Sequence, residues 1–334
     1  MKSAPRVFGP VWSSRLGVSL GVDPLVFKRC SYDCVYCQLG RTRRPSLKRR
    51  QHVEPSILLD ELRQHLDAIG PRRLDWITVV GAGEPTLQLG LGALLGEMRR
   101  LSDAKLAVIT NGSLLQHRDV RDELMGADAV LPSLDAGDPD TFRAINRPHG
   151  DLDFTQVLEG LAKFRRAFSG KLWVEVMLVA GINDTPEALA SLECALERIG
   201  ADGVHVNVPT RPPAETWVCP PSAGRVAHAV RMLGGSSPVP QPAGPSGHPA
   251  CFRNSDLRES IMGIVGRHPM TASELAWTLA GPGPERVLTW LQALERDDIV
   301  QRVERFDKLF WTTSMARYEG GRARRRVRRG VRAG

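Results

Sequence analysis

The sequence lacks any run of apolar residues that approaches the roughly 20 needed to cross a membrane as a helix. Near its start it carries Lys2, Pro5 and Arg6, where a secretory signal would have an uninterrupted apolar stretch. We therefore expect a cytoplasmic protein that has no membrane partner.

Aromatic residues and cysteines are also scarce: aromatic residues make up 6% of the chain, and there are six cysteines among 334 residues. So few cysteines in a cytosolic protein do not indicate a disulfide framework, because that compartment keeps thiols reduced. Metal binding is the better first interpretation. Hydrophobic residues at 42% and charged residues at 25% are ordinary for a soluble globular chain, which excludes disordered, collagen-like and channel-forming classes.

Acidic residues are outnumbered, with 37 Asp and Glu against 45 Lys and Arg, for a net charge of +8. Residues 317–334 hold eight arginines and one acid, so this tail alone carries +7. A second basic run follows the first cysteines and consists of Arg41, Arg43, Arg44, Lys48, Arg49 and Arg50. Basic runs suit phosphate-rich partners, although each is also compatible with a merely solvated segment.

Apolar runs of strand length alternate with longer helical patterns over about residues 16–233, which is typical of repeated βα units and a parallel sheet. The predicted strands are 16–22, 76–80, 106–110, 129–134, 172–179 and 204–208. The predicted helices between them are 56–69, 89–101, 120–125, 154–168 and 186–199. We expect an α/β fold, a partial (β/α)6 TIM-like barrel whose strands are mostly buried on both faces.

A linker and a small C-terminal domain follow. Residues 234–250 contain 12 Gly, Pro or Ser among 17, a composition that cannot bury a core. Three predicted helices (255–267, 271–279, 284–296) and two strands (299–305, 309–312) then indicate a winged helix-turn-helix domain. Its third helix has an apolar stripe of Val287, Leu288, Trp290, Leu291 and Leu294. The expected parts are a barrel (1–233), a linker (234–252), a winged-helix-like domain (253–315) and a disordered Arg-rich tail (316–334).

Three cysteines form the motif C-x3-C-x2-C: Cys30, Cys34 and Cys37. Three thiolates can hold three corners of a cubane, whereas ordinary electron-transfer [4Fe–4S] clusters use four cysteines. One iron then keeps an open position, which distinguishes a reactive metal site from a closed structural one. A zinc site completed by a distant ligand such as His52 is the alternative. The remaining cysteines, Cys194, Cys219 and Cys251, show no paired spacing, and Cys194 is expected in the core.

This motif, followed by the glycine-rich segment GAGEP at 81–85, resembles the radical S-adenosylmethionine (SAM) enzymes. The resemblance implies a [4Fe–4S] cluster whose open iron binds S-adenosyl-L-methionine and delivers one electron that cleaves it to a 5′-deoxyadenosyl radical. It also implies a set of cosubstrate-binding residues at the ends of the strands. These are Tyr36, Gly81, Gly83, Glu84, Asn111, Ser133, Asp135 and Asn183.

Polar residues predicted to face the barrel interior are the candidates for handling substrate. Strand alternation puts His205 and Asn207 on one face, and Glu175 on the inner face of the preceding strand. A buried acid such as Glu175 needs a partner, so a structural ion pair is the alternative there. Arg211 lies after the last strand, where it could hold a carboxylate or phosphate.

Residues 8–43, with SxxLGxSLGxxP before the cysteines and QLGRT after them, resemble more narrowly iron–sulfur oxidoreductases related to tRNA 4-demethylwyosine synthases. The resemblance extends over roughly residues 8–215, where the motifs ITNGSLL, LDAGDPDTF and VPTRPP support it. Those synthases carry an additional cluster from cysteines upstream, and here no cysteine precedes Cys30. Pyruvate-dependent wyosine chemistry is therefore not expected. The resemblance implies a radical enzyme acting on a macromolecule, RNA such as tRNA ahead of protein or peptide, with a flavodoxin or ferredoxin as electron donor. The alternatives are a non-catalytic iron–sulfur sensor with a DNA-binding winged helix, and an activase of a glycyl-radical enzyme.

Overall fold

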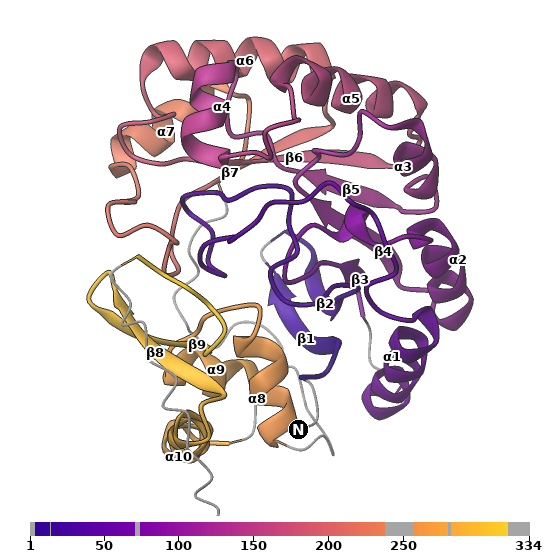
Figure 1. The fold of residues 1–334 in the computed structure, drawn as a ribbon, viewed down its shortest axis with the longest axis vertical. Helices are drawn as coiled ribbons and strands as arrows, with labels where there is room; N and C mark the ends of the chain where they lie inside the picture. The colour runs from indigo at the N-terminus through magenta and orange to yellow at the C-terminus, as the bar shows by residue number, and fades with distance from the viewer. Residues whose placement is uncertain (1–3, 14, 71–73, 238–256, 280–281, 320–334) are drawn as a thin grey trace, which may run out of the picture.

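The computed structural model describes residues 4–13, 15–70, 74–237, 257–279 and 282–319. Seven strands form one sheet in chain order, in which β1 is antiparallel to β2 and all later neighbours are parallel. The strands are β1 (Val7–Ser13), β2 (Gly17–Val22), β3 (Trp76–Val79), β4 (Lys105–Thr110), β5 (Ala129–Pro132), β6 (Lys171–Met177) and β7 (Gly203–Asn207). Figure 1 shows this sheet curled, with helices along its outer side. The α/β partial barrel predicted from the sequence is confirmed.

Strand β1 is an addition to the six predicted strands. It contains Gly9 and Pro10, which read as a break in the sequence pattern, and the pairing with β2 shifts register between Phe8 and Val11. Proline has no N–H for the ladder, so within a sheet it is confined to edges and bulges. The edge position of β1 beside β2 meets that requirement.

The five predicted helices of the barrel are present, and there are three additions. The set is α1 (Pro55–Ile69), η1 (Pro85–Leu87), α2 (Leu91–Leu101), α3 (Arg118–Glu123), α4 (Pro139–Asn146), α5 (Phe154–Ala167), α6 (Pro186–Ile199) and α7 (Ala223–Met232). The short 3₁₀ helix η1 and the helices α4 and α7 were not predicted; α4 begins after Asp138, whose carboxylate accepts hydrogen bonds from the amides of Asp140 and Thr141. The expectation of a core position for Cys194 was wrong: the residue is exposed, because α6 buries the stripe that contains Leu189, Leu192 and Leu196.

Strands β6 and β7 depart from the expectation that both strand faces are buried. On β6, Leu172, Val174 and Val176 are buried, whereas the alternate residues are only partly buried. On β7 the predicted alternation is confirmed, with Val204 and Val206 on the buried face. The other faces of β6 and β7 therefore carry the partly buried side chains, including the polar ones.

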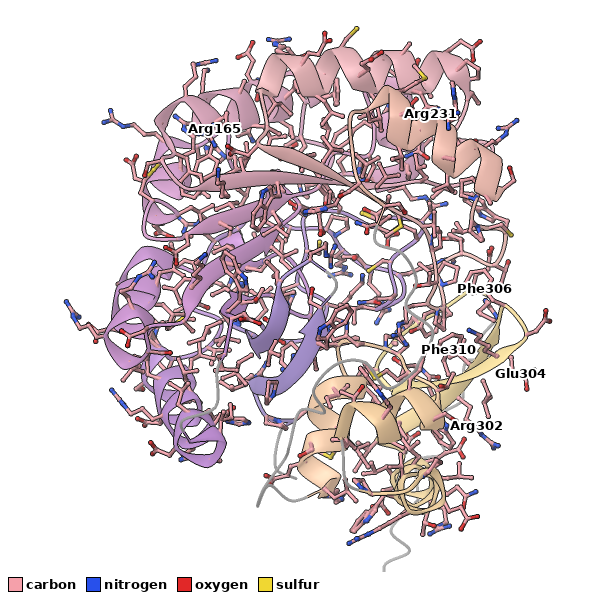
Figure 2. The ribbon with its side chains drawn as sticks, turned by 180° about the vertical axis from the view of Figure 1, so that it is seen from behind. Arg165, Arg231, Arg302, Glu304, Phe306 and Phe310 are labelled. Carbon is pink, nitrogen blue, oxygen red and sulfur yellow. The ribbon has the colours of Figure 1, made fainter. Side chains whose placement is uncertain are left out.

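Residues 257–319, named the C-terminal unit from here on, form a second packed body. It comprises α8 (Leu257–Val265), α9 (Ala272–Leu279), α10 (Pro284–Arg296), β8 (Val300–Arg305) and β9 (Lys308–Thr313). These are the three helices and two strands predicted, in the predicted order, and the winged-helix assignment stays a prediction. Figure 2 labels Arg302, Glu304 and Phe306 on the outlying β8–β9 hairpin.

The core of the C-terminal unit joins Ile261, Leu275, Leu291 and Trp311. The predicted stripe on α10 is right for Val287, Leu291 and Leu294, which are buried, and wrong for Leu288, which is 37% exposed. The spacing of the buried three follows one narrow face of the helix, and Leu288 lies beside that face. Helix α8 packs against β1, which places the unit at the open side of the curled sheet (Figure 1).

Several predictions fall partly or wholly on residues outside the described ranges. These are most of the linker, Cys251, and the tail beyond residue 319. At the start of the predicted linker, Ser236 pairs with His205 of β7 and so extends the sheet. Among the residues that the structure describes, no helix is both long and apolar enough to cross a bilayer.

Candidate functional site

The carboxyl ends of the parallel strands meet at one edge of the sheet, called the mouth here. The three cysteines lie in the loop after β2, the GAGEP segment follows β3, and the other predicted cosubstrate residues follow β4, β5 and β6. Side chains far apart in sequence therefore converge at this edge, which is where ligands bind in α/β folds. Of the cysteines in the described part of the chain, all are free thiols.

Each sulfur of the cysteine loop accepts a hydrogen bond from a nitrogen. The donors are Lys28 Nζ to Cys37 Sγ at 2.8 Å, Asn146 Nδ2 to Cys34 Sγ at 3.5 Å, and Asn111 Nδ2 to Cys30 Sγ at 3.6 Å. Burial raises the pKa of Cys30 to about 12 and raises the pKa of Cys34 as well. The thiols of Cys30 and Cys34 are thus protonated without a metal, and binding iron would release their protons.

This set of donors fits an iron–sulfur cluster better than a single metal ion. Within the described ranges, no three His, Cys, Asp or Glu side chains lie close enough together to hold one ion. The backbone amide of His52, the alternative zinc ligand, donates to Gln88, and its ring Nε2 is buried without a partner in the structure. Three thiols with nitrogen donors around them are the usual surroundings of cluster ligands, whose potential those hydrogen bonds adjust.

The GAGEP segment is held against the cysteine loop by its backbone. The amide of Lys28 donates to the carbonyl of Ala82 at 2.5 Å, and the amide of Glu84 donates to the carbonyl of Arg29 at 2.7 Å. Gly83 lies between these contacts, and a Cβ built there would stand 1.7 Å from the Arg29 oxygen. Only glycine allows this approach. The glycines therefore place the backbone of 81–83 beside the predicted cluster.

Glu84 is almost fully buried, with 1% of its surface exposed, and its carboxylate is saturated by neighbours. Oε1 accepts from the amide and hydroxyl of Thr86 and from the hydroxyl of Thr110, and Oε2 accepts from the amide of Asn111. Burial raises the pKa of this acid, and the four donors oppose that rise. What the structure shows directly is that Glu84 ties the loop after β3 to the loop after β4.

Asp135 is the centre of a second buried network. Its carboxylate accepts from the hydroxyl of Tyr36 at 2.5 Å, from Asn146 Nδ2 at 2.7 Å, and from the amide of Met177 at 2.8 Å. Asn183 Nδ2 donates to the Asp135 carbonyl at 2.8 Å. Burial raises the pKa of both Asp135 and Tyr36. The structure thus brings together the predicted residues Tyr36, Asp135 and Asn183 from three different loops.

The remaining predicted cosubstrate residues lie at the same mouth. Asn111 donates to the Ser31 hydroxyl at 2.8 Å as well as to Cys30, and it accepts from the amide of Ser113. Ser133 is half-buried at the end of β5, where its amide donates to the carbonyl of Thr110. Asn111 therefore lies against the cysteine loop, and Ser133 lies beside the end of β4.

The predicted substrate residues line the inner face of β6 and β7, as alternation required. Glu175 is in register with His205, and its carboxylate forms an ion pair with Arg15. Burial raises the pKa of Glu175 and lowers the pKa of His205. His205 Nδ1 lies 3.2 Å from the Ser236 hydroxyl, and Asn207 continues the same face toward the mouth.

Arg211 lies at the mouth but is already engaged. Its Nη1 donates to Glu274 Oε2 at 2.8 Å and to the carbonyl of Pro269 at 2.6 Å, both in the C-terminal unit. Arg211 therefore links the loop after β7 to the C-terminal unit, and its role toward an anionic substrate stays a prediction.

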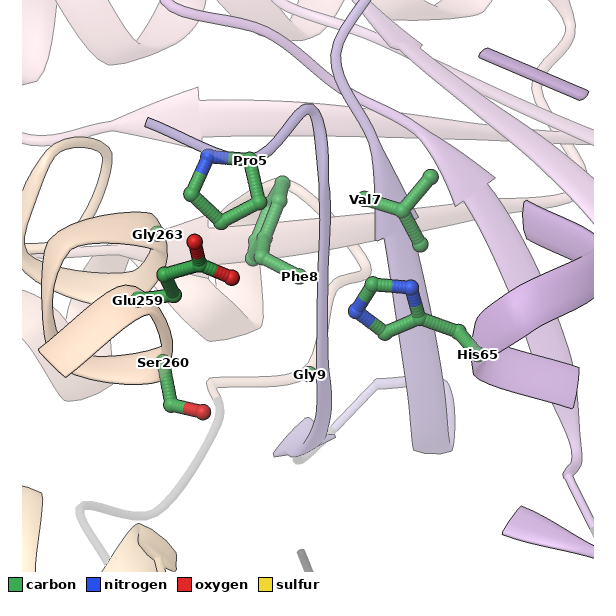
Figure 3. A pocket seen from close by; sticks show the side chains of 8 residues that line it. All are labelled: Pro5, Val7, Phe8, Gly9, His65, Glu259, Ser260 and Gly263. Atoms are coloured by element: carbon green, nitrogen blue, oxygen red, sulfur yellow. The ribbon is translucent and has the colours of Figure 1, made fainter. Parts of the chain in front are cut away.

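Sequence reasoning missed Arg15, Lys28 and Asn146. Lys28 stands two residues before Cys30 and has φ of 59°, a left-handed conformation that is uncommon for a residue other than glycine. No pattern marks Arg15 or Asn146, because each acts on a residue more than 100 positions away. A small pocket of about 50 Å³ at the junction of β1, α1 and α8 (Figure 3) is lined by none of the predicted site residues.

Comparison with known protein families agrees with the motif. Residues 25–192 match the model of the radical SAM superfamily. A UPF0026 protein of Methanocaldococcus jannaschii is 34% identical over 266 residues, which cover 79% of this chain and 82% of that protein. A protein of Brachyspira hyodysenteriae named GTPase Obg is 42% identical over 206 residues, 62% of this chain, which spans only 30% of that protein.

Among solved structures, the chain resembles a radical SAM methyltransferase from Sphaerobacter thermophilus, with a TM-score of 0.48 and 18% identity over 66% of this chain and 65% of that one. It also resembles TYW1 with a lysine–pyruvate adduct bound, with a TM-score of 0.44 and 14% identity over 93% of this chain and 84% of that one.

Proposed function

This chain belongs to the radical SAM superfamily, and on that premise we propose that it is an enzyme in which Cys30, Cys34 and Cys37 hold the cluster and which modifies a macromolecule, RNA ahead of protein. Members of the superfamily are enzymes that use a [4Fe–4S] cluster and S-adenosyl-L-methionine. The chemistry that this pair supplies when bound is one-electron cleavage of the sulfonium, giving methionine and a 5′-deoxyadenosyl radical that takes hydrogen from substrate. A flavodoxin or ferredoxin is proposed to supply the electron.

One observation carries the proposal: three thiols of one loop each accept a hydrogen bond from a nitrogen, and the backbone that leads into this loop is bonded to the GAGEP segment. Lys28 places a cation against Cys37 and opposes the negative charge of a thiolate cluster. Glu84 ties the loop that carries residues 81–83 to the loop after β4, and we propose that the backbone of 81–83 receives the methionine ammonium. Asp135 holds the hydroxyl of Tyr36, which we propose packs beside the adenine.

For the substrate side, His205 and Asn207 are proposed to contact the group that reacts. They line the inner face of β7 and are only partly buried. Glu175 and Arg211 are proposed to position other residues, since their charged groups are already paired with Arg15 and Glu274. No specific contact among the described residues favours the sensor or the glycyl-radical activase.

The preference for RNA rests on the basic run that directly follows the cysteine loop. Two of its members are paired with acids, Arg41 with Glu215 and Arg49 with Glu123. Four other members are exposed and form no ion pair with the residues that the structure describes: Arg43, Arg44, Lys48 and Arg50. Such a cluster beside the mouth favours a phosphate-rich partner and would make its binding depend on salt.

The catalytic part is tested by comparing Cys34→Ala with Cys194→Ala after anaerobic reconstitution of the full chain. Cys194 is exposed on α6, so its loss should leave iron content and 5′-deoxyadenosine formation from dithionite and S-adenosyl-L-methionine unchanged. Cys34→Ala should lose both. Formation of 5′-deoxyadenosine at the wild-type rate by Cys34→Ala would contradict the ligand assignment.

The RNA part is tested by filter binding of bulk tRNA to Arg43→Glu/Arg44→Glu. The matched control is Arg63→Glu/Arg100→Glu, which makes the same charge change at exposed helix positions. Because each phosphate contact contributes about 0.9 to the salt slope, the first variant should lower that slope by about 2. Equal binding by both variants would remove this loop as the RNA surface, and no binding by the wild type would favour a polypeptide substrate.

A further inference from the structure

The C-terminal unit forms hydrogen bonds with the loop that carries Cys37. The hydroxyl of Tyr318 donates to the carbonyl of Gln38 at 2.6 Å, one residue beyond that cysteine. The amide of Arg41 donates to the carbonyl of Arg317 at 2.7 Å, and Gly40 pairs with Arg317 as an isolated bridge. Residues 317–318 thus run along residues 38–41 as a short added strand.

Gly40 is the residue that permits this contact. Its φ is 76°, and a Cβ built there would lie 2.3 Å from the Arg317 carbonyl oxygen, closer than any real side chain could come. Gly181 has the same φ of 76° with no atom within 4 Å of a built Cβ. Replacing either glycine by alanine therefore strains the backbone in the same way. Only at Gly40 does the added methyl group also clash with the C-terminal unit.

The same segment also reaches the opposite end of the open sheet. The amide of Glu319 donates to the carbonyl of Ala214 at 2.8 Å, and its carboxylate accepts from the amide and hydroxyl of Thr216, both in the loop after β7. Arg41, in the loop after β2, pairs with Glu319 at 3.2 Å. Residues 317–319 therefore join the first and the last parallel strand of the half-barrel across the mouth.

A second attachment comes from the turn between α8 and α9. Arg267 Nε donates to Asp23 Oδ2 at 2.7 Å, and these side chains are 7% and 0% exposed. Asp23 directly follows β2 and packs on Gly81, where a built Cβ would lie 2.5 Å from Asp23 Oδ1. Gln38 Nε2 donates to the Arg267 carbonyl at 3.1 Å. The turn thus contacts both the cysteine loop and a residue beside the GAGEP segment.

We propose that the C-terminal unit is a fixed wall of the active site, in which Arg317 and Tyr318 act as positioning residues that hold the loop of Cys37 closed over the cluster. The cluster half of this proposal rests on the proposed function, whereas the closure of the loop does not. The α8–α9 turn and residues 317–319 hold the C-terminal unit to loops at both ends of the parallel sheet. The unit is therefore an integral part of the barrel structure and not a separately attached domain. Its first role is then retention of the cluster and not the reading of nucleic acid.

The test uses the full chain and compares Gly40→Ala with Gly181→Ala. Hydrogen exchange of the protein without iron is measured first, at the amides of residues 38–41. Because the Arg41 amide is bonded to Arg317, we expect exchange there at least about tenfold faster in Gly40→Ala, a loss of about 1.4 kcal/mol of protection. Tyr318→Phe is the second variant and should act in the same direction, because it removes without a clash the hydroxyl that bonds to Gln38 at 2.6 Å and to Thr312 at 3.4 Å. The exposed α10 hydroxyl change Thr289→Val is its control.

The second measurement is the rate at which the reconstituted proteins lose their visible cluster absorbance in air. Faster exchange together with faster loss in Gly40→Ala and Tyr318→Phe supports the proposal. Exchange equal to that of the controls overturns the closure, and faster exchange with unchanged cluster loss overturns its role in retention. If even the wild type takes up no cluster, the proposed function fails while the exchange result still decides whether the unit closes the loop.

Discussion

Replacing Arg267 by Met should remove a buried cation that joins the C-terminal unit to the barrel. The change deletes its ion pair with Asp23 and its hydrogen bond to the carbonyl of Gly263, at 2.7 Å and 2.9 Å. It also removes the guanidinium that lies 4.8 Å from the ring centre of Phe8. Asp23 is fully buried, so its carboxylate would remain without a countercharge.

The expected loss of unfolding free energy follows from that burial. Breaking one partner of a buried ion pair costs about 3–5 kcal/mol, because the other charge stays desolvated. The stacked contact with Phe8 adds about 1 kcal/mol. We expect Arg267→Met to lose about 5 kcal/mol, a large part of the total stability of an ordinary domain. The double variant Asp23→Asn/Arg267→Met should lose less than half as much, since no unpaired charge is left and Asn keeps an oxygen for the Leu25 amide.

The assay is urea unfolding followed by tryptophan fluorescence and by circular dichroism, whose coincidence tests two-state behaviour. Arg100→Met is the control, because its pair with Glu97 is exposed, at 72% and 47%, and such pairs contribute less than about 1 kcal/mol. A loss below 1 kcal/mol in Arg267→Met, or a double variant as unstable as the single one, would refute the reasoning.

Three further predictions concern the site. Gly83→Ala should weaken binding of S-adenosyl-L-methionine at least about tenfold in calorimetry, because its methyl group would displace the Arg29 carbonyl that lies 1.7 Å from the built Cβ. Lys28→Met should lower the midpoint potential of the cluster by about 60–130 mV, because the charge-assisted hydrogen bond to Cys37 stabilises the more negative reduced state by about 1.5–3 kcal/mol. A redox titration followed by electron paramagnetic resonance measures this potential. Burial and neighbouring arginines lower the pKa of His268 to about 3. Between about pH 6.5 and pH 3 the unfolded chain therefore binds a proton at this histidine and the folded chain does not. The free energy of unfolding should then drop by about 1–2 kcal/mol between pH 7 and pH 5, and His268→Gln should lack that part of the drop.

Each of these predictions has a matched control. Gly96→Ala adds a methyl group to a helix where a built Cβ meets nothing within 4 Å, and it should leave cosubstrate affinity unchanged. Lys48→Met removes an exposed cation of the neighbouring basic run, and a shift in potential equal to that of Lys28→Met would show a general charge effect. His117→Gln changes an exposed histidine, and an equal loss of pH dependence would argue against His268 as its source.

The parts of the fold that follow from local patterns were predictable. Six strands and five helices of the barrel follow from runs of Val, Ile and Leu and from amphipathic spacing, and the structure has them within a few residues of the predicted ends. Strand β1 was missed because Gly9 and Pro10 interrupt its pattern, and only pairing with β2 makes it a strand. Leu288 was misplaced because an apolar residue at the margin of a helical stripe is buried or exposed according to what packs against it.

For the site, sequence spacing by itself determined the three cysteines, the glycine-rich segment and the polar residues at the strand ends, since each signal is short and carries its own chemistry. Tertiary structure alone decided their partners: Lys28 and Asn146 on the sulfurs, Arg15 on Glu175, and Glu84 turned inward to the loops rather than outward. It alone also decided that the C-terminal unit lies on the cysteine loop. The physical reason is that a hydrogen bond or an ion pair between residues 100 or 250 positions apart has no periodicity along the chain, and exists only once packing has brought the two groups together.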